Sequence, residues 1–191
     1  MGLCADAGDC VLMMSPSQIE AMRPRVVEIA KQWLNTPYHP EARIKGAGAD
    51  CAMMPLMVYK EAGIIKVIPE VPHYPVDWAV HNNTPVYTDL VERVVRDNGL
   101  CEVAPPPERE PLPGDFLLFH FAHAYSHGAI VTAWPLCIHA HIRCGIVYVD
   151  ALQNPALAQK IADGVVKCFS FGHAPAAGSA ALPSAGGLDV R

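Results

Sequence analysis

The stretch GAGADCAMMPLMVYKEAG, residues 46–63, decides the fold because a glycine-rich loop ends within it and an apolar helix begins. Asp50 is a residue type that favours the N-cap position of a helix. A stripe of apolar side chains at helical spacing follows it, and Gly63 is a natural left-handed cap at the other end. We therefore expect a largely buried helix from Cys51 to Ala62, with Cys51 as its first residue.

A helix is also expected before this stretch. Ser17 and Glu20 form a capping-box pattern, and Pro24 is a residue type favoured at a first helical position. The apolar spacing that follows predicts a helix that ends near Leu34. Residues 40–49 are glycine-rich and lack a hydrophobic period, so we expect them to form a loop.

After the central helix, the prolines between residues 64 and 84 exclude long regular elements. We expect an extended connection there, with Tyr74 and Trp78 as aromatic anchors. Thr84 followed by a proline predicts the start of a third helix. The sequence Asp97-Asn98-Gly99 predicts its end.

The pattern then changes to short β-type runs separated by turn residues. The expected strands are residues 115–121, 127–132, 137–142, 145–149 and 165–171, with a short helix at 155–162 before the last of them. Helices followed by an antiparallel sheet define an α+β fold. We expect one domain over residues 17–173, between an N-terminal extension, 1–16, and a flexible tail rich in Ala and Gly, 174–191.

Composition excludes several classes of function. The chain has 191 residues, 51% of them hydrophobic, and a formal net charge of -5, so it has no basic surface for nucleic acid. Its apolar runs are too short to span a membrane. The first ten residues hold no Lys or Arg, so we expect no secretory signal and synthesis in the cytoplasm. Seven cysteines without a repeated spacing predict free thiols.

Cys51 is the residue best placed for nucleophilic chemistry. At a helix start, unpaired N–H groups and the positive end of the helix dipole favour a thiolate. The Cys51 N–H could also stabilise an oxyanion. His127, at the head of a predicted strand, is the expected general base. A hairpin through Trp134 and Pro135 would bring His139 beside it to orient the ring, and His141, on the same strand face, is left open as the alternative.

Two other interpretations of these residues stay open. Taken singly, a helix-initial cysteine or a strand histidine is more often structural than catalytic. The same residue types also bind zinc or iron, but their spacings match no standard ligand frame, so we expect no metal and no other cofactor. The two candidate ligand sets are His120, His123 and His127, and Cys137, His139, His141 and Cys144.

Five motifs, in order, resemble those of the NlpC-type peptidases, a papain-like family in which a cysteine opens a helix packed on a small antiparallel sheet. They are WLNTPY at 33–38, GAGADC at 46–51, LPGD at 112–115, SHGAIV at 126–131 and IHA at 138–140. The resemblance implies a cysteine peptidase with Cys51 as nucleophile and His127 as base. It favours His139 over His141 as the third member, and it implies that Tyr38 and Asp50 bind the substrate.

Within that family the chain looks closest to forms encoded in bacteriophage tail gene clusters, on the stretch YPVDW at 74–78 and on Ser126-His127-Gly128 paired with Trp134-Pro135. This likeness implies hydrolysis of an amide in peptidoglycan stem peptides, commonly between D-γ-glutamate and a diamino acid. It also implies tail-tip proteins as partners. The protein would be located in a virion tail, assembled in the host cytoplasm and acting in the bacterial cell envelope.

The chain also departs from the family. Ala52-Met53-Met54 follows the nucleophile where many members have Ser-Gly, and the connection from Gly63 to Gly114 is long. The alternative function is therefore a structural tail-tip protein whose Cys and His cluster is unused or binds a metal.

Overall fold

The computed structural model describes residues 16–66, 68–81, 84–98 and 100–171. The helices are α1 (Pro16–Gln32), α2 (Met53–Ala62), α3 (Trp78–His81), α4 (Val86–Asn98) and α5 (Pro155–Ala162). The strands are β1 (Arg43–Ile44), β2 (Gly48–Ala49), β3 (Cys101–Val103), β4 (Phe116–Phe121), β5 (Ala124–Ala133), β6 (Leu136–His141), β7 (Gly145–Asp150) and β8 (Val166–Ser170). The α+β class predicted from the sequence is confirmed.

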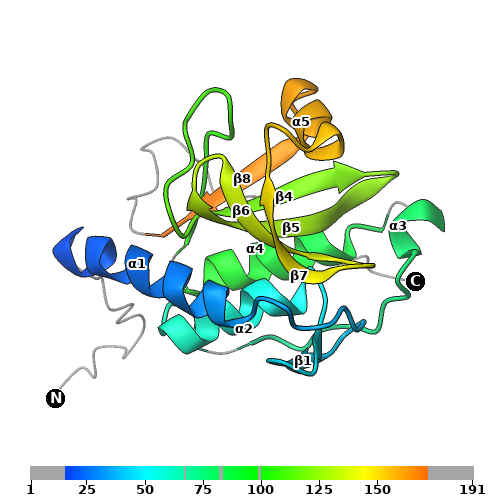
Figure 1. Cartoon of the computed structure of the whole chain (residues 1–191), viewed down its shortest axis with the longest axis horizontal. Coiled ribbons are helices and arrows are strands. Elements are labelled where there is room, and N and C mark those ends of the chain that lie inside the picture. The colour runs from blue at the N-terminus through cyan, green and yellow to red at the C-terminus, as the bar shows by residue number, and fades with distance from the viewer. Residues whose placement is uncertain (1–15, 67, 82–83, 99, 172–191) are drawn as a thin grey trace, which may run out of the picture.

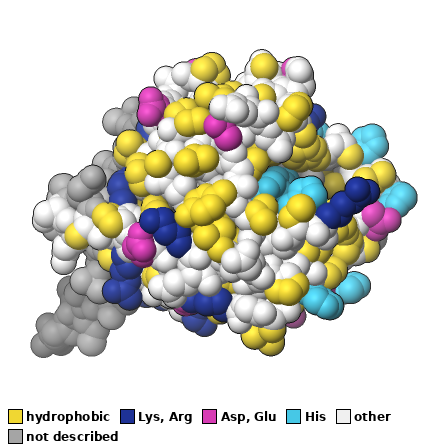
Figure 2. Space-filling view, viewed as in Figure 1, with side chains coloured by type: hydrophobic (Ala, Val, Ile, Leu, Met, Phe, Trp, Pro, Cys, Tyr) yellow, Lys and Arg dark blue, Asp and Glu magenta, His cyan; other side chains and the backbone are white. Residues whose placement is uncertain are grey.

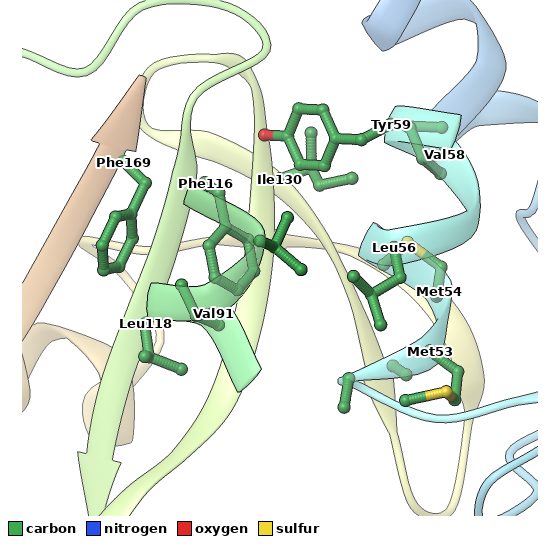
Figure 3. Packing of buried hydrophobic residues seen from close by; sticks show 14 of the residues in the cluster. Met53, Met54, Leu56, Val58, Tyr59, Val91, Phe116, Leu118, Ile130 and Phe169 are labelled. Carbon is green, nitrogen blue, oxygen red and sulfur yellow. The ribbon is translucent and has the colours of Figure 1, made fainter. Parts of the chain in front are cut away.

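Within the described residues, the main sheet has six antiparallel strands in the order β3-β8-β4-β5-β6-β7. Helices α1, α2 and α4 lie together on one side of this sheet (Figure 1). Figure 3 shows side chains of α2 and α4 meeting those of β4, β5 and β8 in the larger core. A smaller core lies on the other face, where Leu157 and Ile161 of α5 pack against Leu117 and Phe119. The sheet is thus covered on both faces.

The structure corrects where two helices begin. Helix α1 already includes Pro16, so Ser17 is not its cap and Pro24 lies inside it rather than at its first position. Tertiary contacts explain this, because Arg23 is only 4% exposed and its guanidinium is held in the core. Helix α2 begins at Met53, so Cys51 lies in the turn before the helix and is not its first residue.

Other expectations were met or missed locally. The cap at Gly63 is confirmed by its φ of 83°. The segment predicted as a loop, 40–49, contains the short β1–β2 pair, and strand β3 was not predicted. Residues 1–15, 172–191 and Gly99 lie outside the described residues, so the extension, the tail and the cap of α4 stay predictions.

Two further findings concern membrane-spanning helices and the cysteines. In the described part of the chain, no helix combines the length and apolar character needed to cross a membrane. Among the described cysteines, those at positions 51, 137, 144 and 168 are free thiols, as the sequence predicts.

A buried ion pair joins the N-terminal helix to the sheet. Arg23 donates to Asp115 Oδ1 at 2.9 Å, and Asp115 also accepts from Ser170 Oγ at 2.6 Å and from Arg109 at 3.0 Å. The Asp115 side chain is 0% exposed, so its charge depends on these partners and on the Leu112 N–H, which donates to Oδ2 at 2.9 Å. The pair fixes α1 against the turn before β4 and against β8.

Replacing Asp115 with Asn should therefore lower the free energy of unfolding by about 3–5 kcal/mol, since it leaves two arginines without a buried counter-charge. Urea unfolding followed by circular dichroism measures this. Glu28→Gln, which breaks the exposed Glu28–Lys31 pair on the same helix, is the matched control and should have little effect. Equal losses in the two variants would contradict the role given to Asp115.

Candidate active site

All five residues predicted for the site line one cleft of about 410 Å³. They are Tyr38, Asp50, Cys51, His127 and His139. The cleft lies between the turn before α2, the segment that leads into α3, and the ends of β5 and β6. Figure 2 shows several histidine side chains towards the right of that view, with hydrophobic side chains around them.

Cys51 contacts strand β5 at the two residues that flank His127 in the sequence. Its Sγ donates to the Ser126 carbonyl oxygen at 3.5 Å, and the Gly128 backbone N–H donates to the same sulfur. The paired register of β5 and β6 starts at Ala129 opposite His139, so the sulfur meets β5 just before that pairing begins. A nucleophilic sulfur and an imidazole, 76 positions apart in the sequence, thus occupy one corner of the cleft.

The two histidines form the contact that the predicted hairpin requires. His127 Nε2 and His139 Nδ1 are 2.8 Å apart, and the His139 side chain is buried. If His127 is to act as a base through Nδ1, its Nε2 must carry the proton and donate it to His139. His141, the alternative, lies at the cleft but is exposed, and its Nδ1 accepts from the Arg143 backbone N–H.

The Asp50 carboxylate is saturated by donors of the protein. Its Oδ1 accepts from the backbone N–H groups of Ala52 at 3.0 Å and Met53 at 2.8 Å. Its Oδ2 accepts from the Glu41 N–H and the Tyr74 hydroxyl, both at 2.7 Å. Asp50 is 1% exposed, so it fixes the turn before α2 and the cleft wall around it. A direct contact of Asp50 with substrate stays a prediction.

This arrangement reverses the expectation of a thiolate at rest. Burial raises the pKa of the Cys51 thiol to about 12, and the adjacent Asp50 charge raises it further, against the lowering by the Gly128 N–H. The helix start gives no net help, because Asp50 takes two of its free N–H groups and adds a negative charge. The sequence indicates Asp50 as an N-cap residue, whereas its charge also opposes ionisation of the neighbouring sulfur.

Burial also keeps the two histidines neutral. Burial, with smaller contributions from His139 and His141, lowers the pKa of His127 to about 3. Burial and then His141 lower the pKa of His139 to about 4. At neutral pH the resting site is therefore a thiol beside two uncharged imidazoles.

Tyr38 reaches the cleft because its segment pairs with the loop before Cys51. The His39 N–H donates to the Ala49 carbonyl at 3.0 Å, and the Ala49 N–H donates to the Pro37 carbonyl at 3.1 Å. Gly48 permits this approach, since a Cβ there would lie 2.7 Å from the His39 Cβ. Burial, with a smaller contribution from the Asp50 charge, raises the pKa of the Tyr38 hydroxyl, so it stays a neutral donor.

Two tyrosines make contacts at the site that the sequence did not predict. Tyr74, predicted as an anchor, contacts Asp50 through its hydroxyl. Tyr87 of α4 was not predicted at all, yet its hydroxyl donates to the Cys51 carbonyl oxygen. Its signal in the sequence is weak, because a tyrosine in the first turn of an amphipathic helix is usually part of the core.

In the described part of the chain, neither candidate set of metal ligands is grouped into a binding site. Among the described residues, no three His, Cys, Asp or Glu side chains are grouped so that they could hold a metal ion. Cys137 is 0% exposed in the smaller core, whereas Cys144 lies exposed in the turn between β6 and β7.

Comparisons with known proteins give a likeness of fold. No family model matches the sequence, and no curated protein matches it. Twenty-seven chains of solved structures match. NlpC1 from Trichomonas vaginalis is 16% identical over 70% of this chain and 40% of its own, with a TM-score of 0.47. An NlpC/p60 family protein from Bacillus cereus is 18% identical over 72% and 37%, with a TM-score of 0.47.

The NlpC/p60 domain of the peptidoglycan hydrolase SagA is 16% identical over 67% of this chain and 88% of its own, with a TM-score of 0.41. The chain spans about two fifths of the length of the first two neighbours. At such identities and TM-scores, these likenesses do not by themselves assign an activity to the chain.

The thiol pKa predicts a slow reaction of Cys51 with iodoacetamide at pH 7 and a rate that rises steeply only at strongly alkaline pH, because the thiolate is the reactive form. Peptide-resolved mass spectrometry measures the rate at each pH, and the exposed Cys144 is the reference within the same molecule. Alkylation of Cys51 that is already maximal below pH 7 would contradict a neutral resting thiol.

The two lowered histidine pKa values also predict acid sensitivity. Both lie below the value of about 6.5 expected for an unfolded histidine, so the unfolded chain binds more protons. Their contribution to stability is complete above about pH 6.5 and is lost as the pH falls towards 4 and then 3. In urea unfolding at pH 7 and 4.5, a His127→Gln/His139→Gln variant should lose less stability on acidification than the unaltered protein. Equal losses would contradict these shifts.

Proposed function

We propose that the chain is a cysteine peptidase that hydrolyses an amide of peptidoglycan stem peptides. The observation that carries the proposal is the position of the Cys51 sulfur, which contacts Ser126 and Gly128 on either side of His127 while His127 is bound to His139. A nucleophile, a base and a group that orients the base are thus joined in one open cleft. The five motifs shared with the NlpC-type peptidases support the same reaction.

Acylation starts from the neutral thiol. When the substrate carbonyl reaches the sulfur, the Cys51 S–H proton passes to His127 Nδ1 as the C–S bond forms. Because the thiol is not ionised beforehand, proton transfer and attack are coupled. His127 then gives this proton to the leaving amine nitrogen as the C–N bond breaks, which leaves a thioester on Cys51.

Deacylation repeats these proton movements with water. His127 Nδ1 takes a proton from water, the oxygen attacks the thioester carbonyl, and the proton returns to the departing Cys51 sulfur. In both steps His127 is briefly an imidazolium. His139 Nδ1 accepts from the His127 Nε2–H, so His139 stabilises that cation without changing its own charge.

Two donors near the sulfur can bind the oxyanion. The N–H groups of Ala52 and Met53 are used by Asp50, whereas the Cys51 N–H is directed at its own sulfur and is next to the reacting carbon. The neutral Tyr38 hydroxyl is the second donor available in the cleft, in keeping with a role in substrate binding.

The finer assignment is to a bacteriophage tail, where the protein would contact tail-tip proteins and act in the bacterial cell envelope. The stretch Tyr74–Trp78, on which the likeness to tail-associated forms depends, lines the cleft and binds Asp50. A structural tail-tip protein is the second candidate function. The residues after Cys51, Ala52-Met53-Met54, favour it, since they depart from the motif of the family.

Replacing Cys51 with Ala or Ser should lower the release of muropeptide fragments by about a thousand-fold or more, because no other group can form the thioester. Mass spectrometry of digested muropeptides measures the products and identifies the bond that is cut. Cys144→Ser is the matched control and should retain full activity, because that thiol is exposed outside the cleft lining.

The outcome separates the two candidate functions. Fragments released by the unaltered protein and lost in both Cys51 variants support the peptidase. Release that survives both substitutions would contradict Cys51 as nucleophile. A purified, folded protein that releases no fragment from any stem peptide would instead favour the structural role.

A further inference from the structure

The carbonyl group of Cys51 lacks its usual helical partner. In a helix, each carbonyl accepts from the N–H four residues later, and the Met54 N–H donates to the Asp50 carbonyl at 3.1 Å in this way. The next bond would run from residue 55 to the Cys51 carbonyl. Residue 55 is proline, which has no N–H. The peptide that follows the nucleophile is therefore left without backbone support.

Tyr87 supplies the missing donor from a different helix. Its hydroxyl donates to the Cys51 carbonyl oxygen, and its side chain is buried beneath the cleft, with its ring 6.3 Å from that of Phe116. A partly buried carbonyl without a partner is costly, so this bond holds the carbonyl side of the Cys51–Ala52 peptide, whose N–H donates to Asp50 Oδ1.

The same hydroxyl also contacts the strand that carries the base. A Cβ added at Gly128 would lie 2.3 Å from the Tyr87 hydroxyl oxygen and 2.7 Å from Phe116, so glycine is required there. Gly128 follows His127 and donates its N–H to the Cys51 sulfur. The oxygen of Tyr87 thus lies between the turn of the nucleophile and the strand of the base.

We propose that Tyr87 is a positioning residue that takes the place of the N–H missing from Pro55 and keeps the Cys51 sulfur at Ser126 and Gly128, beside His127. It touches no reacting atom and acts only through the Cys51 peptide and β5. The role in hydrolysis rests on the proposed peptidase function, whereas the role in placing the sulfur does not.

The substitution Tyr87→Phe removes only the hydroxyl and is the direct test. It should lower kcat by about ten- to a hundred-fold with little change in KM, since a small displacement of a reacting group is costly while the cleft is unchanged. The freed turn should also expose the sulfur, so alkylation of Cys51 by iodoacetamide at pH 7–9 should become faster. Faster alkylation with slower hydrolysis indicates a displaced sulfur when a variant of equal stability loss does not show the same combination.

Tyr59→Phe is the matched control. Tyr59 is an equally buried tyrosine whose hydroxyl also donates to a backbone carbonyl, that of Gly114 at 2.6 Å, away from Cys51. The Tyr59→Phe substitution should leave kcat and the alkylation of Cys51 unchanged, even if it lowers the thermal stability of the protein as much as Tyr87→Phe does. Equal effects of the two substitutions on kcat and alkylation would overturn the proposal.

A second-site change tests the mechanism itself. Pro55→Ala restores an N–H that can reach the Cys51 carbonyl, so in the Tyr87→Phe background it should recover most of kcat and return alkylation to its slow rate. Unchanged kcat and alkylation in Tyr87→Phe, or no recovery on adding Pro55→Ala, would overturn the role given to the hydroxyl. If the unaltered protein hydrolyses no stem peptide, the proposed function fails, while the alkylation rates still decide the role of Tyr87.

Discussion

The four hydrogen bonds to the Asp50 carboxylate are the constraint on which the rest of the site depends. They join the start of α2 to Glu41 in the preceding loop and to Tyr74 in the long connection, and so fix the turn that carries Cys51. The cleft wall and the nucleophile are therefore set by one buried group. Tyr87, which binds the Cys51 carbonyl, extends this support to α4 and to β5.

The same constraint adds to the electrostatics of the site. Burial of the sulfur opposes its ionisation, the adjacent Asp50 carboxylate adds to this, and the imidazoles nearby carry no charge to compensate. Such a site does not store a reactive thiolate. It depends instead on substrate binding to align the S–H proton with His127, which makes geometry the main source of rate and explains why so many buried donors hold the turn in place.

Much of this architecture follows from local signals in the sequence. The α+β class, the C-terminal end of α2 at Gly63 and the hairpin that pairs His127 with His139 came from hydrophobic period, a glycine cap and spacing. The rest depends on contacts distant in the sequence. Pro24 lies inside α1 because Arg23 is bound across the fold by Asp115, and the Cys51 thiol stays neutral because of burial that no motif encodes. The role of Tyr87 depends on where α4 packs.

The central claim is that a neutral His127 presents Nδ1 to the sulfur while its Nε2–H is donated to His139. The ¹⁵N chemical shifts of the His127 ring at neutral pH test this most directly, because they distinguish the two neutral tautomers from the cation. The account predicts that the His127 ring is neutral and protonated at Nε2, and that this form persists down to about pH 4. In His139→Ala the preference for the Nε2-protonated tautomer should be lost. A protonated imidazolium at pH 7, or a ring protonated at Nδ1 alone, would contradict it.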